Sequence, residues 1–149
     1  MFFWVTRNKI RRLFDVERIQ GAIEAAEHQT SGEIRVSVAP FFWGNVHRTA
    51  EKAFVRLGMS RTRERNGILF FVVPARRRFS ILGDVGIHER VGQEFWDALT
   101  ATVAAEFRQS HFTEGLVRGI EEVGRQLAEH FPCDRPRDGN ELSDEIDFE

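Results

Sequence analysis

Residues 66–83 read NGILFFVVPARRRFSILG. The six apolar residues at 68–73 lie between an Asn-Gly pair and Pro74, a pattern typical of a central strand that is covered on both faces. A short basic link then leads into residues 79–82, where apolar and polar side chains alternate. A link of this length predicts a hairpin, so the strand at 79–82 should run antiparallel to the strand at 68–73.

Upstream of the hairpin, Asp15 is a good N-cap for a helix that ends near residue 31. One face of this helix carries four apolar residues, Val16, Ile19, Ile23 and Ala26. The acidic residues, Glu27 among them, are expected elsewhere on the helix. Alternation at residues 34–38 then predicts a strand, and a second helix runs from a cap at Asn45 to Gly58.

Downstream of the hairpin, an apolar stripe over residues 95–107 predicts one long helix. A last helix is expected from a cap at Thr113 to about residue 132. This order of elements favours an α/β fold, a three-layer α/β/α sandwich with a small mixed sheet. The predicted organisation is an N-terminal amphipathic helix or arm at 1–14, an α/β domain at 15–132 and an acidic C-terminal tail at 133–149.

Composition fits one globular domain of 149 residues, with 42% hydrophobic and 30% charged residues. Residues 134–149 hold seven acidic and two basic residues, a net −5, which leaves the rest of the chain at +3. Cys133 is the single cysteine, so an internal disulfide is excluded, and with no apolar run of membrane-spanning length we expect a cytoplasmic protein.

The N-terminus begins with Phe2, Phe3 and Trp4, followed by basic residues. This aromatic segment could contact a membrane surface or a protein partner. The alternative interpretation is a helix packed against the flank of the domain itself.

Strand directions predict where a binding site would form. A helical crossover makes the strands at 34–38 and 68–73 parallel, and the hairpin returns along the second. Glu33, Asn66 and Asp84 should therefore meet at one edge of the sheet. Carboxylate, amide and carbonyl oxygens are the ligands that calcium or magnesium prefers, so these three residues are the predicted metal ligands. The alternative for Asp84, which lies between Gly83 and Gly86, is a helix cap.

Other chemistry has weaker support in the sequence. The five histidines fall on separate elements without ligand spacing, and no serine lies in a nucleophile elbow. The arginine clusters at 61–65 and 76–78 lack interleaved aromatic residues, so nucleic acid is not an expected partner. No catalytic constellation is evident, and enzymatic activity stays an open question.

Three segments resemble one known family: TSGEIRV at 30–36, RTRERNGIL at 61–69 and ILGDVGIHERV at 81–91. Over about residues 16–146 the chain resembles the TPM-domain family, in its short soluble bacterial form. The resemblance implies an α/β/α sandwich, divalent-metal binding (chiefly calcium) and, for some members, acid phosphatase activity or a part in membrane-protein upkeep.

Position by position, Asp84 matches the acidic turn of the family and Asn66-Gly67 matches its Asn-Gly pair. Longer members carry Asp-Asn-Gly where this chain has Arg65-Asn66-Gly67. The leading hypothesis is a calcium-binding accessory domain. The alternatives are a metal-dependent acid phosphatase acting on phosphate esters, with Arg65 holding the phosphate, and a protein-interaction module.

Overall fold

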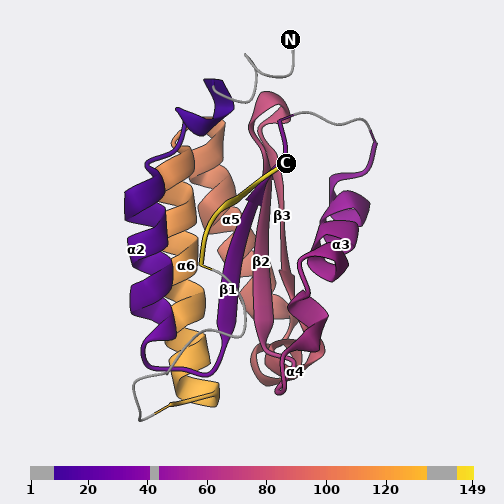
Figure 1. The fold of residues 1–149 in the computed structure, drawn as a ribbon, viewed down its shortest axis with the longest axis vertical. Coiled ribbons are helices and arrows are strands. Elements are labelled where there is room, and N and C mark those ends of the chain that lie inside the picture. The colour runs from indigo at the N-terminus through magenta and orange to yellow at the C-terminus, as the bar shows by residue number, and fades with distance from the viewer. Residues whose placement is uncertain (1–8, 41–43, 134–143) are drawn as a thin grey trace.

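The computed structural model describes residues 9–40, 44–133 and 144–149. A four-stranded sheet in the order β3-β2-β1-β4 forms the middle layer, and helices cover both of its faces (Figure 1). The predicted α/β sandwich with a small mixed sheet is confirmed. The N-terminal residues 1–8, on which the predicted aromatic contact segment falls, lie outside the described residues.

The strand β2 (Gly67–Val73) is the centre of the sheet, and all seven of its residues are buried. It pairs in parallel with β1 (Glu33–Val38) and antiparallel with β3 (Arg78–Gly83), as the crossover and the hairpin predict. The turn η2 (Pro74–Arg76) closes the hairpin and places Arg77 in the left-handed region with a φ of 50°.

Alternate residues of β2 face two separate cores, and β1 contributes to one of them. Ile34, Ile68 and Phe70 face a large cluster built with three helices, α2 (Val16–Glu27), α5 (Gln93–Arg108) and α6 (Phe112–His130). Leu69 and Phe71 face the opposite way, onto α3 (Val46–Arg56) and the short turn η1 (Met59–Arg61). The predicted caps of the first two helices are present, because Asp15 accepts from the Arg18 N–H and Asn45 from the Arg48 N–H.

The apolar stripe at 95–107 lies within one long helix, α5, as predicted. Gly92, with a φ of 78° that favours glycine, separates α5 from a short preceding helix, α4 (Val85–Val91). The last helix begins at Phe112, and its expected cap, Thr113, instead accepts a hydrogen bond from the Asp15 N–H. That bond ties the start of α2 to the start of α6.

The C-terminal segment adds a strand that the sequence pattern does not predict. β4 (Asp147–Phe148) pairs in parallel with Ser37 and Val38 at the open edge of β1. The Arg56 guanidinium and the Ser37 hydroxyl both bond to the Asp147 carboxylate at 2.8 Å. Although burial opposes ionisation, these two hydrogen bonds lower the pKa of Asp147.

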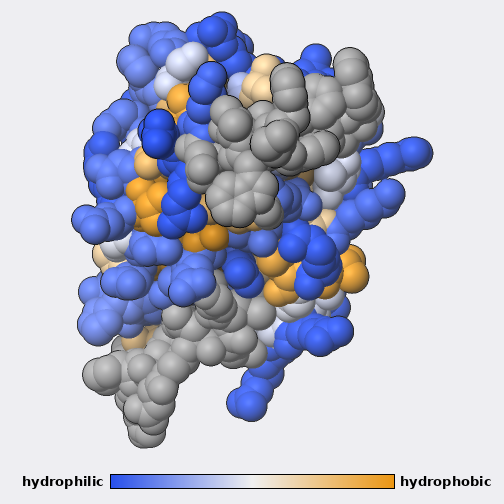
Figure 2. All heavy atoms as spheres, turned by 45° about the horizontal axis from the view of Figure 1, so that its top comes forward, coloured by the Kyte–Doolittle hydropathy of each residue, from blue (hydrophilic) through white to orange (hydrophobic). Residues whose placement is uncertain are grey.

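Residues 9–14 pack against the domain. Ile10 and Phe14 belong to the large core, and the Phe14 ring lies against Phe112 and Phe148. None of the described helices is both long enough and apolar enough to cross a membrane. On the face seen in Figure 2, the coloured surface shows hydrophobic residues in separate patches bordered by hydrophilic ones.

Gly86 is a position where the fold tolerates no side chain. A Cβ there would lie 2.2 Å from the Glu64 carbonyl oxygen and 2.6 Å from that of Arg65. We predict that Gly86→Ala destabilises the protein by about 1–3 kcal/mol, because α4 must move away from this backbone. Gly21, inside α2, has nothing within 4 Å of its Cβ position, so the control Gly21→Ala should stabilise by about 0.5–1 kcal/mol. Urea denaturation of the two variants measures both effects, and equal stability would contradict the assignment.

Candidate functional site: a buried carboxylate cluster

The backbone at the start of β1 and β2 and the end of β3 converges as predicted. Glu33 pairs with Gly67 across the parallel strands, and the Asp84 N–H donates to the Gly67 carbonyl at 2.9 Å. The three predicted ligands therefore share one edge of the sheet. Their side chains, however, turn to three different sets of partners.

The Asp84 carboxylate is held by an arginine. Arg65 donates to it through Nε at 2.6 Å and through an Nη at 2.8 Å, a bidentate pair, while the side chain of Asp84 is only 5% exposed. Oδ1 of Asp84 also accepts from the Val85 N–H at 2.8 Å and so caps α4. The cap that the sequence offered as the alternative is thus present, and the Arg65 guanidinium supplies the positive charge.

The backbone of Arg65 is shaped for this contact. Its φ of 53° lies in the left-handed region, which is unfavourable for a residue with a side chain. The Arg65 carbonyl accepts a hydrogen bond from the Gly86 N–H at 2.8 Å, so the loop is fixed from both sides of Asp84. Arg65 therefore supplies the counter-charge of Asp84 from the loop that precedes β2.

Asn66 is buried and contacts the loop before β1. Its Nδ2 donates to the Ser31 hydroxyl at 3.1 Å, and that hydroxyl donates to Glu64 at 2.8 Å. The Asn66 N–H bonds to Thr62 Oγ1. Among the described residues, Asn66 Oδ1 has no hydrogen-bond partner.

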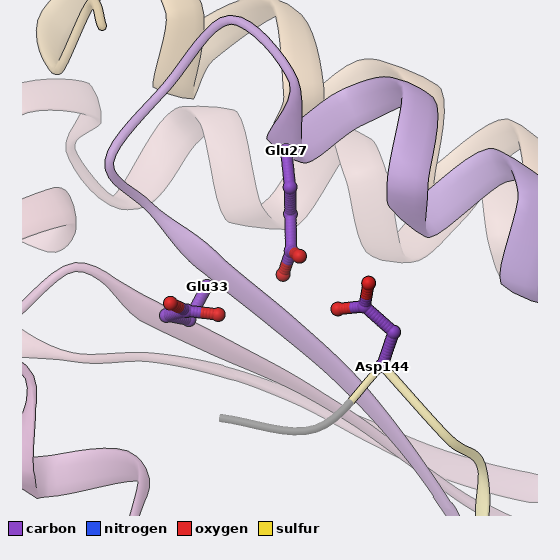
Figure 3. A group of neighbouring side chains, drawn as sticks. All are labelled: Glu27, Glu33 and Asp144. Atoms are coloured by element: carbon purple, nitrogen blue, oxygen red, sulfur yellow. The ribbon is translucent and has the colours of Figure 1, made fainter. Parts of the chain in front are cut away.

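Glu33 instead belongs to a cluster of three carboxylates with Glu27 and Asp144. One oxygen from each lies within 4.8 Å of the others. Figure 3 shows Glu27 reaching from the end of α2 into the space between Glu33, at the start of β1, and Asp144, on the C-terminal segment. Glu27 is 3% exposed and Glu33 1% exposed, so two of the three acidic residues are buried. The site therefore joins a helix, a strand and the C-terminal segment.

Glu27 also completes the hydrogen bonding of the sheet edge. Its Oε2 accepts from the Ile34 N–H at 2.7 Å, on the part of β1 that precedes the pairing with β4. The other oxygen, Oε1, is buried and accepts no hydrogen bond from a described N–H or hydroxyl donor. Burial, and next a hydrogen bond with the Asp144 carboxyl group, raise the pKa of Glu27 to about 10, while the Ile34 bond acts in the opposite direction.

Sequence reasoning missed Glu27, although a signal was present. Ile19, Ile23 and Glu27 follow one another at intervals of four, and the structure buries all three. The expectation that Glu27 lies away from the buried face is wrong. An acidic residue in register with a buried stripe is the pattern that could have identified it.

No comparable arrangement for covalent catalysis occurs among the described residues. The nearest approach is His47, whose Nδ1 lies 3.1 Å from the Ser80 hydroxyl and whose Nε2 lies 3.3 Å from Glu51. His47 and Glu51 are 62% and 60% exposed, so the pair is solvated and typical of a surface helix. His88 accepts a hydrogen bond from the Trp96 ring N–H.

The fold and the sequence together define the class of protein. The model of the TPM domain matches residues 13–126, and the chain belongs to this family. The BA42 protein of the psychrophilic bacterium Bizionia argentinensis is similar along most of its length: 37% identity, 91% of this chain and 95% of the other covered, and a TM-score of 0.82.

Two more distant structures share the fold. The N-terminal domain of the cg2496 protein from Corynebacterium glutamicum has 16% identity and a TM-score of 0.61 over 85% of this chain and 80% of the other. An N-terminal domain from P. gingivalis has 19% identity and a TM-score of 0.62 over 77% and 76%. No functionally curated protein matches the sequence.

The roles of Asp84 predict a graded response to substitution. Asp84→Ala removes both the cap of α4 and the partner of Arg65, so we expect a loss of about 1–2 kcal/mol or more in unfolding free energy. Asp84→Asn keeps the oxygen that accepts from the Val85 N–H and should cost less. Thermal denaturation of the two variants measures the difference; an Asn variant as unstable as the Ala variant would show that the cap contributes little.

Glu27 predicts a pH dependence of stability in the absence of metal. Because its pKa is about 10 in the folded protein and 4.5 ordinarily, the folded state holds this proton more tightly. Stability should therefore fall as pH rises from about 4.5 towards 10, by up to about 1.4 kcal/mol per pH unit for one proton.

Glu27→Gln is the matched variant for this test. Glutamine still accepts from the Ile34 N–H and carries no titrating group, so its unfolding free energy should depend less on pH between 6 and 9. Urea denaturation in the presence of a chelator gives both slopes. Identical slopes for wild type and variant would show that Glu27 does not titrate abnormally.

Proposed function

We propose that this TPM domain is an accessory, non-catalytic module that binds one divalent cation between Glu27, Glu33 and Asp144. Calcium is the cation that we propose first. The observation that carries the proposal is the buried Glu27 carboxyl group, which lies with Glu33 and Asp144 so that one oxygen of each falls within 4.8 Å of the others. Carboxyl groups buried this close together are costly unless a proton or a cation neutralises them.

The spacing of the carboxylates suits one ion. Calcium binds oxygen ligands at about 2.3–2.6 Å, so two ligands on opposite sides of it lie about 5 Å apart. The three carboxylate oxygens here lie within 4.8 Å of one another. Calcium accepts six to eight oxygens in a flexible geometry, which a set of ligands from three separate segments can meet more easily than the strict octahedron of magnesium.

The charge of the cluster supports the same conclusion. Carboxyl groups gathered in a largely buried space oppose one another's ionisation, and no described lysine, arginine or histidine forms an ion pair with Glu27. A divalent cation would take the place of a proton here and offset the charge of the ionised groups. The Asp84 carboxylate, in contrast, already has Arg65 as its counter-ion, so the cation belongs more naturally with the cluster.

The phosphatase alternative gains less from the geometry. It assigns phosphate binding to Arg65, whose guanidinium is engaged by Asp84 in a bidentate pair. The binding function is therefore the one that we put forward.

Calorimetric titration with calcium, and separately with magnesium, tests the proposal. Wild-type protein should bind one calcium ion, and Glu33→Gln or Glu27→Gln should weaken the affinity at least about tenfold, because each removes a charged ligand. Asp84→Asn is the control: it also removes a buried carboxylate from the same end of the sheet, and it should leave calcium affinity unchanged.

Two results would overturn the assignment. Loss of binding in Asp84→Asn with normal binding in Glu33→Gln would move the ion to the Asp84 loop, as the sequence pattern predicts. Absence of heat and of amide shifts in the wild type at millimolar calcium would exclude the site altogether.

A further inference from the structure

The cluster contains one ligand that is attached to the domain differently from the others. Glu27 and Glu33 lie at the end of α2 and the start of β1, both parts of the packed body. Asp144 lies at the start of the described C-terminal segment, residues 144–149, which follows a part of the chain outside the described residues. An ion bound to all three carboxylates would therefore cross-link this segment to the body.

We propose that the cation controls the attachment of the C-terminal segment, and so whether the edge of β1 is covered. This inference rests on the proposed function. Without the ion, attachment at Asp144 rests on a hydrogen bond with Glu27. With the ion, the same carboxylate becomes a metal ligand, which strengthens the attachment.

The segment has further attachments besides Asp144. The Glu149 N–H donates to the Val38 carbonyl at 3.0 Å, and Ile146 is buried against the core. Arg56, which is 46% exposed, holds both Asp147 and Glu149 from α3. The Ser37 hydroxyl also bonds to Asp147, and the Phe148 ring lies against Phe14. A two-residue strand at a chain terminus is still among the elements that detach most readily.

Linkage makes the effect reciprocal. If the ion strengthens attachment of the segment by some factor, then attachment strengthens binding of the ion by the same factor. When the segment is detached, the N–H and C=O groups at the edge of β1 become available to another extended strand.

Amide hydrogen exchange by NMR tests the proposal on the whole chain. The probe is the Glu149 amide, and the control is the Ala39 amide, which donates to the Val72 carbonyl at 2.9 Å on the β2 side of β1. Saturating calcium should slow exchange at both amides, and the slowing factor at Glu149 should be roughly five to a hundred times that at Ala39. The variant Glu27→Gln should show no such difference.

A second arm uses Arg56→Gln, which weakens attachment at a residue outside the carboxylate cluster. Removing a positive charge near acidic groups should by itself tighten calcium binding. The proposal predicts the opposite, a two- to five-fold weaker affinity and faster exchange at Glu149 without calcium. Arg118→Gln is the matched control, since Arg118 is also an exposed arginine, paired with Glu106 at 3.3 Å, and its loss should leave both readouts unchanged.

The outcomes separate this inference from the proposed function. Calcium binding with equal slowing at Glu149 and Ala39, or tighter binding in Arg56→Gln, overturns control of the segment and leaves the metal site standing. Absence of calcium binding in the wild type overturns both.

Discussion

The strand β2 imposes the constraint on which this molecule depends. All seven of its residues are buried, so both faces of the sheet must be covered and both neighbouring strand positions must be filled. Helices α2, α5 and α6 cover one face and α3 the other, while β1 and β3 pair with the two sides of β2 (Figure 1). The helical crossover makes β1 parallel to β2, and the hairpin makes β3 antiparallel to it. These directions bring Glu33, Asn66 and Asp84 to one edge of the sheet.

Most of this framework can be predicted from the sequence because hydrophobic periodicity reports burial directly. The elements that escape prediction are those decided by single residues or by distant contacts. The apolar stripe at 95–107 marks α5, whereas the short helix α4 before it ends where Gly92 takes a positive φ, which periodicity does not report. The strand β4 has two residues, and its position depends on Arg56 and Ser37, which lie more than 90 positions away.

In the site, the position of the backbone could be predicted from the sequence, but the orientation of the side chains could not. Strand direction correctly places the three predicted ligands at a common edge, because direction is a property of connectivity. Which way each side chain turns depends on neighbours that the pattern does not reveal. Arg65 adopts a left-handed backbone conformation and captures Asp84, and Asn66 turns to Ser31. The partners of Glu33 come from the end of α2 and from a C-terminal segment about 110 residues further along the chain.

The buried carboxyl groups of Asp84 and Glu27, at the same end of the sheet, are thus neutralised in different ways. At Asp84 the counter-charge is internal: Arg65 is covalently part of the loop, and its contact with Asp84 contributes whenever the loop is folded. At Glu27 the described residues provide an N–H from Ile34 but no cation, and burial together with a hydrogen bond with Asp144 raises the pKa of the carboxyl group, which favours a bound proton in place of a cation. A proton neutralises one carboxylate, whereas a divalent ion can bind three at once. One of these three carboxylates belongs to the C-terminal segment, so replacing the proton by an ion adds a link between distant parts of the chain. That link exists only when the ion is bound, whereas the contact of an internal arginine is always present in the folded protein.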